Sequence, residues 1–163
     1  MDIERVIHPS QAEIDAFAQQ SVSSKPIVML NLLRFRELAD YAGADVDPGP
    51  ISGRAAYERY GRAVVKLLWR TGGRLLWAGS VRTNLIAPSY EQWDQALLVY
   101  YPSRAAFVRM VTSEEYPKVV VHRTAALEDS RLLETRAARL PKVALGASRL
   151  AVRAWGRIRG AGR

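Results

Sequence analysis

The chain has 163 residues, 48% of them hydrophobic and 25% charged, which is typical of one globular domain with an extension. It contains no cysteine and only two histidines, which excludes a disulfide framework, thiol chemistry and a histidine-rich metal site. The net charge is +8, but residues 1–135 hold 16 basic and 16 acidic residues, so the excess lies in residues 136–163. With no signal-peptide pattern and no apolar run near the roughly 18 residues that span a membrane, we expect a cytoplasmic protein.

The first half of the chain predicts a helix, a strand and a second helix. Residues 10–20 indicate a short helix, because Ser10 is a suitable N-cap and Glu13 stands three residues later. Residues 26–35 are nearly continuous in apolar residues and predict a strand with both faces covered. After a loop rich in Asp, Gly and Pro, residues 52–73 predict a helix that carries an apolar stripe and ends in two glycines.

The second half predicts two strands, two helical pieces and a final strand. We expect a long strand over residues 74–87, bent near Gly79, and another over residues 95–101. Residues 102–111 indicate a helix capped by Ser103, and residues 112–127 a second helical piece, broken near Pro117. Residues 128–136 close the domain as a strand.

The order β-α-β-β-α-β is that of the ferredoxin-like split βαβ pattern, an α+β fold with a four-stranded antiparallel sheet and helices on one face. Two helices leave the other face of such a sheet open. Apolar side chains exposed over that area normally mark a partner. We therefore expect a homodimer in which two sheets pack face to face as an α/β barrel.

Five segments carry a family resemblance: VMLNLLRFRE, SGRAAYERYG, GGRLLWAG, WDQALLVYYPSRAAF and YPKVVVHRTAALEDSRLL. Together they resemble the DUF1330 family, across residues 24–135. The resemblance implies the dimeric α/β-barrel superfamily with its ferredoxin-like fold, and a homodimer. It implies no reaction, because the family has no known function and the superfamily includes cofactor-free monooxygenases, isomerases, haem enzymes and stress-induced proteins. We divide the chain into an N-terminal lead-in (1–25), the barrel domain (26–135) and a basic amphipathic extension (136–163).

His122 is the candidate catalytic residue, because an imidazole exchanges protons near neutral pH. The alternative is a helix histidine bonded to a backbone carbonyl or a neighbouring carboxylate. Arg123 is a candidate to bind an anionic group, or else pairs with Glu128 or Asp129. Adjacent helix residues point about 100° apart, so His122 and Arg123 are not expected to serve one ligand atom. Glu128 and Asp129 face opposite sides of a strand, which argues against a two-carboxylate mechanism.

Four further residues are candidates for ligand binding. Asn31 lies in an apolar strand, where its amide needs a partner: a ligand, or a backbone group at a bulge or dimer contact. Arg34 ends that strand and could bind a carboxylate or phosphate, or remain solvated. Tyr60 and Trp77 could line an aromatic pocket, although plain core packing is the alternative.

The extension has a basic face and an apolar face if it is helical. The basic face would carry Lys142, Arg149, Arg153 and Arg157, and Trp155 would lie on the apolar face. This pattern is typical of a helix at an anionic membrane surface, and packing on the body or disorder are alternatives. Nucleic acid is a less favoured partner, because the neutral body offers no basic groove.

Two functional hypotheses follow. The first is a small-molecule-binding homodimer, or a cofactor-free enzyme, acting on a small organic acid or aromatic compound through His122, Asn31, Arg34, Tyr60, Trp77 and Arg123. The second is a non-enzymatic interaction protein attached by its extension to an anionic membrane or an acidic partner. Neither hypothesis requires a cofactor or a metal.

Overall fold

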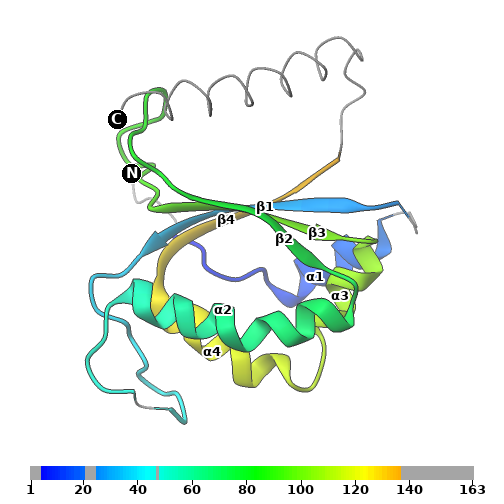
Figure 1. Ribbon diagram of the computed structural model, residues 1–163, viewed down its shortest axis with the longest axis horizontal. Helices are drawn as coiled ribbons and strands as arrows, with labels where there is room; N and C mark the ends of the chain where they lie inside the picture. Colours follow the sequence, from blue (N-terminus) through cyan, green and yellow to red (C-terminus); the bar gives the residue numbers. More distant parts are fainter. Residues whose placement is uncertain (1–4, 21–24, 47, 137–163) are drawn as a thin grey trace, which may run out of the picture.

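The computed structural model describes residues 5–20, 25–46 and 48–136, which form an α+β fold around one four-stranded sheet (Figure 1). The elements are α1 (Gln11–Gln19), β1 (Ile27–Phe35), α2 (Gly53–Arg70), β2 (Arg74–Ser80), β3 (Gln95–Tyr101), α3 (Arg104–Val111), α4 (Tyr116–Ala126) and β4 (Leu127–Thr135). Neighbouring strands are antiparallel, in the order β2-β3-β1-β4. The predicted ferredoxin-like fold is thereby confirmed.

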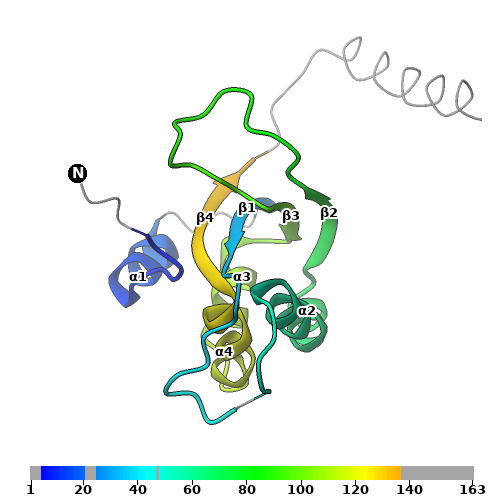
Figure 2. The ribbon, with the colours of Figure 1, turned by 90° about the vertical axis from the view of Figure 1, so that its left-hand side faces the viewer.

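The described helices lie on one side of the sheet, which we call its inner face (Figures 1 and 2). In Figure 2, α2 lies below the β2 side of the sheet and α4 below the β1–β4 side, while α1 stands beside β4. No helix among the described residues is long and apolar enough to cross a membrane. The candidate surface-binding residues Lys142, Arg149, Arg153, Trp155 and Arg157 lie outside the described residues.

Serine side chains start three of the helices. Ser10 and Glu13 form the predicted capping box of α1. Ser103 caps α3 as predicted, and Ser52 caps α2 by accepting a hydrogen bond from the Ala55 backbone N–H. At the other end of α2, Gly72 has a φ of 77°, a backbone conformation that glycine adopts without steric cost. The ends of α2 therefore follow from local chemistry.

The predicted strand over residues 74–87 is too long, because β2 ends at Ser80. Ser80 pairs with Gln95, the first residue of β3, so β3 has no further residue with which β2 could pair. A hydrogen bond from the Val81 backbone N–H to the Asp94 carbonyl oxygen, 3.0 Å long, closes the base of the loop. This loop projects away from the helices in both ribbon views (Figures 1 and 2).

A bulge, and not the bend predicted near Gly79, is the irregularity of β2. The register shifts between Leu75, which pairs with Val99, and Trp77, which pairs with Leu98. Without a bulge, residues two apart in a strand face the same side. The bulge puts Leu75 on the inner face and Trp77 on the opposite, outer face. There the Trp77 ring occupies the space beside Gly79 that a Cβ atom would need.

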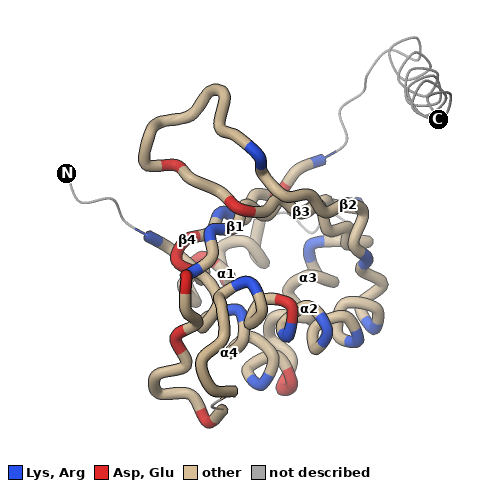
Figure 3. The backbone as a smooth tube through the Cα atoms, turned by 60° about the vertical axis from the view of Figure 1, so that its left-hand side comes forward, with Lys and Arg blue, Asp and Glu red and all other residues tan. Residues whose placement is uncertain are grey.

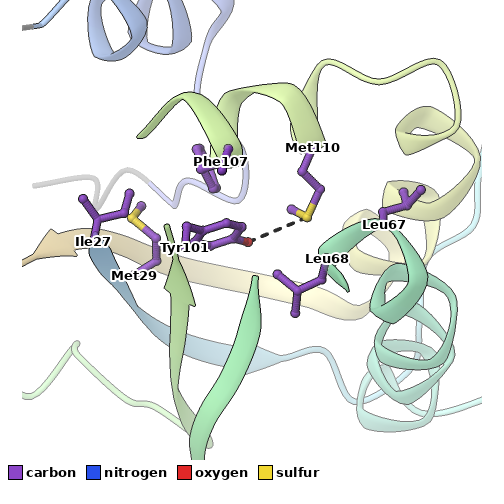
Figure 4. Packing of buried hydrophobic residues seen from close by; sticks show 8 residues of the cluster. Ile27, Met29, Leu67, Leu68, Tyr101, Phe107 and Met110 are labelled. Carbon is purple, nitrogen blue, oxygen red and sulfur yellow. Dashed lines mark hydrogen bonds between the residues drawn. The ribbon is translucent and has the colours of Figure 1, made fainter. Parts of the chain in front are cut away.

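Two apolar clusters hold the helices to the inner face. One joins β1, β3, α2 and α3 and consists of Ile27, Met29, Leu67, Leu68, Tyr101, Ala106, Phe107 and Met110 (Figure 4). The other joins β1, β3, α2, α4 and β4 and consists of Leu33, Ala56, Leu97, Ala126 and Leu127. Burial of these side chains supplies the main free energy that docks the helical layer.

The outer face of the sheet is apolar and no described element covers its centre. In register across the strands lie Trp77, Leu98, Leu30 and Leu133. Trp77 is 53% exposed and Leu133 is 46% exposed. By contrast, the solvent side of α2 carries a series of basic residues (Figure 3).

Candidate functional site

A pocket of about 560 Å³, which we call the central pocket, lies between the inner face and the helices. Its walls come from all four strands, α1, α2, α3, α4 and the segment before α1, and are mostly apolar. Its residues include members of both core clusters, so the pocket occupies the zone where the clusters meet. The volume is in the usual range for small-molecule sites. The polar side chains that line it are His8, Asn31, Tyr57, Tyr60, Tyr101, Tyr116, Arg123 and Thr124.

Arg123 is a buried cation in the wall of the central pocket. Only 7% of the residue is exposed. Its guanidinium donates hydrogen bonds to the Ile7 carbonyl oxygen and, over 3.1 Å, to Ser130 Oγ. Among the described residues no carboxylate forms an ion pair with it, since Glu128 pairs with Arg5 and Arg34, and Asp129 pairs with Arg131. The predicted alternative partners of Arg123 are therefore engaged elsewhere.

His8 extends the hydrogen bonding of Arg123. Arg123 Nη1 lies 3.4 Å from His8 Nδ1, and His8 Nε2 lies 2.7 Å from Thr124 Oγ1. The Thr124 hydroxyl donates to the Val120 carbonyl oxygen, so it accepts a hydrogen bond from Nε2 when the imidazole is neutral. Burial, and then the charge of Arg123, lower the pKa of His8. His8 therefore stays neutral near pH 7 and adds no second charge to the pocket.

Tyrosine side chains supply uncharged polar groups to the central pocket. The rings of Tyr57 and Tyr60 contact each other in a tilted arrangement, with their centroids 5.3 Å apart. Burial raises the pKa of Tyr57 to about 12 and raises the pKa of Tyr60 well above its ordinary value. Burial also raises the pKa of Tyr101, whose hydroxyl lies 3.8 Å from Met110 Sδ (Figure 4). These phenols remain protonated donors throughout the physiological range.

The structure brings Asn31, Tyr60 and Arg123 together in the central pocket, as three of the candidate ligand-binding residues. The Asn31 amide donates a hydrogen bond of 3.3 Å to the Met29 carbonyl oxygen. No described residue donates to Asn31 Oδ1, so this oxygen is available to a ligand. Asn31 therefore bonds a nearby backbone carbonyl group and also lines the pocket, whereas the sequence left a backbone partner and a ligand as alternatives.

Trp77, Arg34 and His122 do not line the central pocket. The prediction that Trp77 lines a pocket with Tyr60 is wrong, because the β2 bulge places Trp77 on the outer face of the sheet, on the opposite side from Tyr60. Arg34 lies in a separate hollow at the end of β1, where its Nε is 2.8 Å from Glu128 Oε2. His122 Nδ1 lies 2.9 Å from the Tyr41 hydroxyl, on the side of α4 that holds the loop after β1. The 100° offset between successive helix residues separates His122 from Arg123, as predicted.

His8 is the site residue that the sequence failed to indicate. It stands just before Pro9 and the α1 N-cap, and no nearby motif distinguishes it. Its partners, Arg123 and Thr124, are more than 100 residues away along the chain. The described residues contain no cluster of three or more His, Cys, Asp or Glu side chains suited to a metal ion.

Comparisons with known proteins identify relatives without a known function. A crystal structure of a protein of unknown function from Rhodopseudomonas palustris is 36% identical, with a TM-score of 0.74, and the match covers 84% of this chain and 100% of that one. A crystal structure of that protein in methylated form gives 36% identity and a TM-score of 0.75, over 84% and 98% of the two chains. No curated protein matches the chain.

A more distant match is a dimeric protein of unknown function and ferredoxin-like fold from Bacteroides fragilis. It is 12% identical with a TM-score of 0.44, over 72% of this chain and all of that one, which is too low a likeness to bear on the assembly of this chain. A family model described as a domain of unknown function, DUF1330, matches residues 49–135. Together with the 36% identical relative, this match shows that the chain belongs to the DUF1330 family.

Proposed function

We propose that this protein is a homodimer that binds a small organic acid with an apolar body in the central pocket. The observation that carries the proposal is Arg123, a buried guanidinium in an apolar wall with no carboxylate partner among the described residues. His122 lies outside this pocket, so the proposal concerns binding and assigns no chemical step.

An uncompensated cation favours an anionic ligand for an electrostatic reason. Removing a charge from water costs free energy unless a partner replaces the lost hydration. Within the described part of the chain, Arg123 has only neutral acceptors, Ile7 O and Ser130 Oγ among them. A ligand carboxylate would supply the missing negative charge through charge-assisted hydrogen bonds. The arrangement therefore selects an acid over a neutral molecule of the same shape.

The rest of the pocket favours an apolar ligand body. Most of its lining is aliphatic or aromatic, and each methylene buried there contributes about 0.8 kcal/mol. The protonated phenols of Tyr57 and Tyr60 and the carbonyl oxygen of Asn31 offer a few fixed polar contacts. This combination of one charged anchor and an apolar chamber supports an amphipathic monoacid.

The outer face supports the homodimer. Its apolar side chains lie in register, and no described element covers its centre. Patches of this kind mark interaction surfaces. A second copy of the same sheet, rotated about a twofold axis, presents the same apolar surface in return. We place this dimer in the cytoplasm.

Calorimetric titration tests the proposed ligand class. Octanoate should bind the wild-type protein, and octanamide, which has the same chain without the charge, should bind at least tenfold more weakly. Arg123→Gln should weaken octanoate binding about tenfold to a hundredfold, the range of charge-assisted hydrogen bonds. Arg34→Gln is the matched control, because Arg34 is an arginine outside the pocket. Equal affinities of octanoate for wild type and Arg123→Gln would contradict the proposal.

A second proposal concerns residues 136–163, which carry the whole net charge of +8. We propose that this extension attaches the protein to an anionic membrane surface, where each basic residue contributes about 1 kcal/mol. The chain lacking residues 137–163 should lose co-sedimentation with vesicles of phosphatidylserine and phosphatidylcholine. Vesicles of phosphatidylcholine alone are the control for charge. Unchanged sedimentation of the shortened chain would exclude this role.

A further inference from the structure

Gly61, in the middle of α2, has no structural reason to be glycine. Glycine in a helix costs stability relative to alanine. It is normally explained by a positive φ or by a close neighbour. Gly61 is not among the described glycines with positive φ, and a Cβ atom built on it would meet nothing within 4 Å. Gly53 in the same helix is the opposite case, since its Cβ would meet the Arg36 carbonyl oxygen at 2.4 Å.

The space beside Gly61 belongs to the central pocket. Gly61, Val65 and Leu75 all line the pocket. Gly61 is exposed, and Leu75 is 54% exposed, so the pocket opens to solvent between α2 and the edge strand β2. We call this the α2–β2 opening.

The α2–β2 opening and Arg123 lie toward opposite edges of the sheet. Arg123 is bound to Ser130 of β4, whereas Leu75 belongs to β2, and these two strands are the outer strands of the sheet. Figure 2 shows α2 below the β2 side and α4 below the β4 side. Leu132 of β4 and Leu75 both line the pocket, so it spans the sheet. Three strand spacings of about 4.8 Å make the span across the sheet about 14 Å, and the two ends are also displaced along the strands, because Ser130 is in register with Gln95 of β3 and Leu75 with Val99.

From these observations we infer that the ligand is an elongated acid, and that Gly61 sets the longest chain the pocket accepts. The inference rests on the proposed function, in which Arg123 holds the carboxylate. With carbon–carbon bonds of about 1.5 Å, an extended chain of roughly ten to twelve carbon atoms covers the part of this span that runs across the sheet from the Arg123 side to the α2–β2 opening. The missing side chain at Gly61 leaves room for the end of that chain.

A chain-length series on the full-length protein tests the inference. Equilibrium affinities are measured by calorimetry for hexanoate, octanoate, decanoate and dodecanoate, below their micelle-forming concentrations. In wild type, affinity should rise with each added pair of carbons up to decanoate or dodecanoate. Gly61→Leu should lower the affinity for dodecanoate at least tenfold and should keep the affinity for hexanoate within twofold of the wild-type value. Because the readout is an equilibrium constant, slower passage through a narrowed opening does not imitate this result.

Two control variants separate chain-length selection from other effects. Gly61→Ala tests whether the loss depends on side-chain size, and it should weaken dodecanoate less than Gly61→Leu does. Arg62→Leu puts the same new residue at the next, exposed position of α2, outside the pocket, and should bind every acid as wild type does. Leucine and alanine favour helices over glycine, so unfolding is not the expected cause of any loss.

The outcomes distinguish this inference from the proposed function. The acids could bind in an Arg123-dependent way while Gly61→Leu lowers the affinity for every acid by the same factor, or for no acid. In that case the chain-length inference is wrong and the proposed function stands. If no acid in the series binds wild type, the proposed function fails and the inference fails with it. If Gly61→Leu loses affinity for the longer acids and Arg62→Leu does not, the result supports both the chain-length inference and the proposed function.

Discussion

The two faces of the sheet differ in what the described chain supplies to cover them. The inner face is covered by helices, and the space left between them is a pocket with one buried charge, Arg123. The outer face carries Trp77, Leu98, Leu30 and Leu133 in register, without a cover at its centre. Gaps on a covered face favour small ligands, and a bare apolar face favours a macromolecular partner.

This comparison separates two functions that the sequence mixed together. Trp77 was predicted to line a ligand pocket with Tyr60, but the two residues lie on opposite faces. Trp77 therefore serves the proposed dimer contact and Tyr60 the proposed ligand site. Substitutions on one face should leave the other function intact, which makes the comparison testable.

The largest expected effect comes from a charge on the outer face. Leu98 pairs with Leu30 on one side and with Trp77 on the other, so it lies centrally. Leu98→Glu would bury an uncompensated carboxylate in the dimer contact, at a cost of about 3–5 kcal/mol. Native mass spectrometry should show wild-type dimers and Leu98→Glu monomers at the same concentration.

Octanoate binding and a charge control complete that test. Leu98→Glu should still bind octanoate, because Leu98 does not line the central pocket. Lys66→Glu, at an exposed position of α2, should remain dimeric. A dimeric Leu98→Glu protein would show that the outer face is not the contact between subunits.

A smaller pair of expected effects concerns the free energy of unfolding and compares two glycines of α2, Gly53 and Gly61. At Gly53 an added Cβ would meet the carbonyl oxygens of Arg36 and Ala126 at 2.4 and 2.5 Å. Backbone atoms cannot move aside cheaply, so Gly53→Ala should lower the free energy of unfolding by about 1–3 kcal/mol. Gly61→Ala, in open space, should raise it by about 0.5–1 kcal/mol. Urea unfolding measures both, and a loss at Gly61 would mean that its space is not free.

The parts of the fold that depend on local chemistry could be predicted from the sequence. The helix starts at Ser10 and Ser103 are such cases, because a hydroxyl in that position bonds a nearby backbone N–H. The strand order follows from the alternation of elements. The end of β2 could not be predicted, because it depends on where β3 begins to pair, at Gln95.

The candidate site was predictable only in part, for a related reason. Asn31 was found because its amide interrupts an apolar strand, Tyr60 because an aromatic side chain can line a pocket, and Arg123 because a guanidinium can bind an anionic group. Trp77 was placed wrongly because one extra residue in β2 reverses which side it faces. His8 was missed because its role comes from tertiary contacts with α4, and the sequence around it gives no sign of them.

The smallest expected effect is a pH dependence that compares the two histidines. Burial lowers the pKa of His8, with a further contribution from Arg123, and burial lowers the pKa of His122, with a further contribution from Arg59. A histidine with a lowered folded-state pKa binds protons more readily when unfolded. The stability it contributes is therefore complete above the unfolded pKa of about 6.5 and is lost as the pH falls toward the folded pKa.

Urea unfolding at pH 7.5 and pH 5.5 should show this loss of stability. His8→Gln and His122→Gln should each make the difference between the two pH values smaller. Octanoate affinity separates the two positions: at pH 7.5, His8→Gln should change it, because His8 bonds Arg123 beside the proposed carboxylate site, and His122→Gln should not. If His122→Gln weakened octanoate and His8→Gln did not, the acid would bind on the Tyr41 side of α4, and the central pocket would lose its assignment.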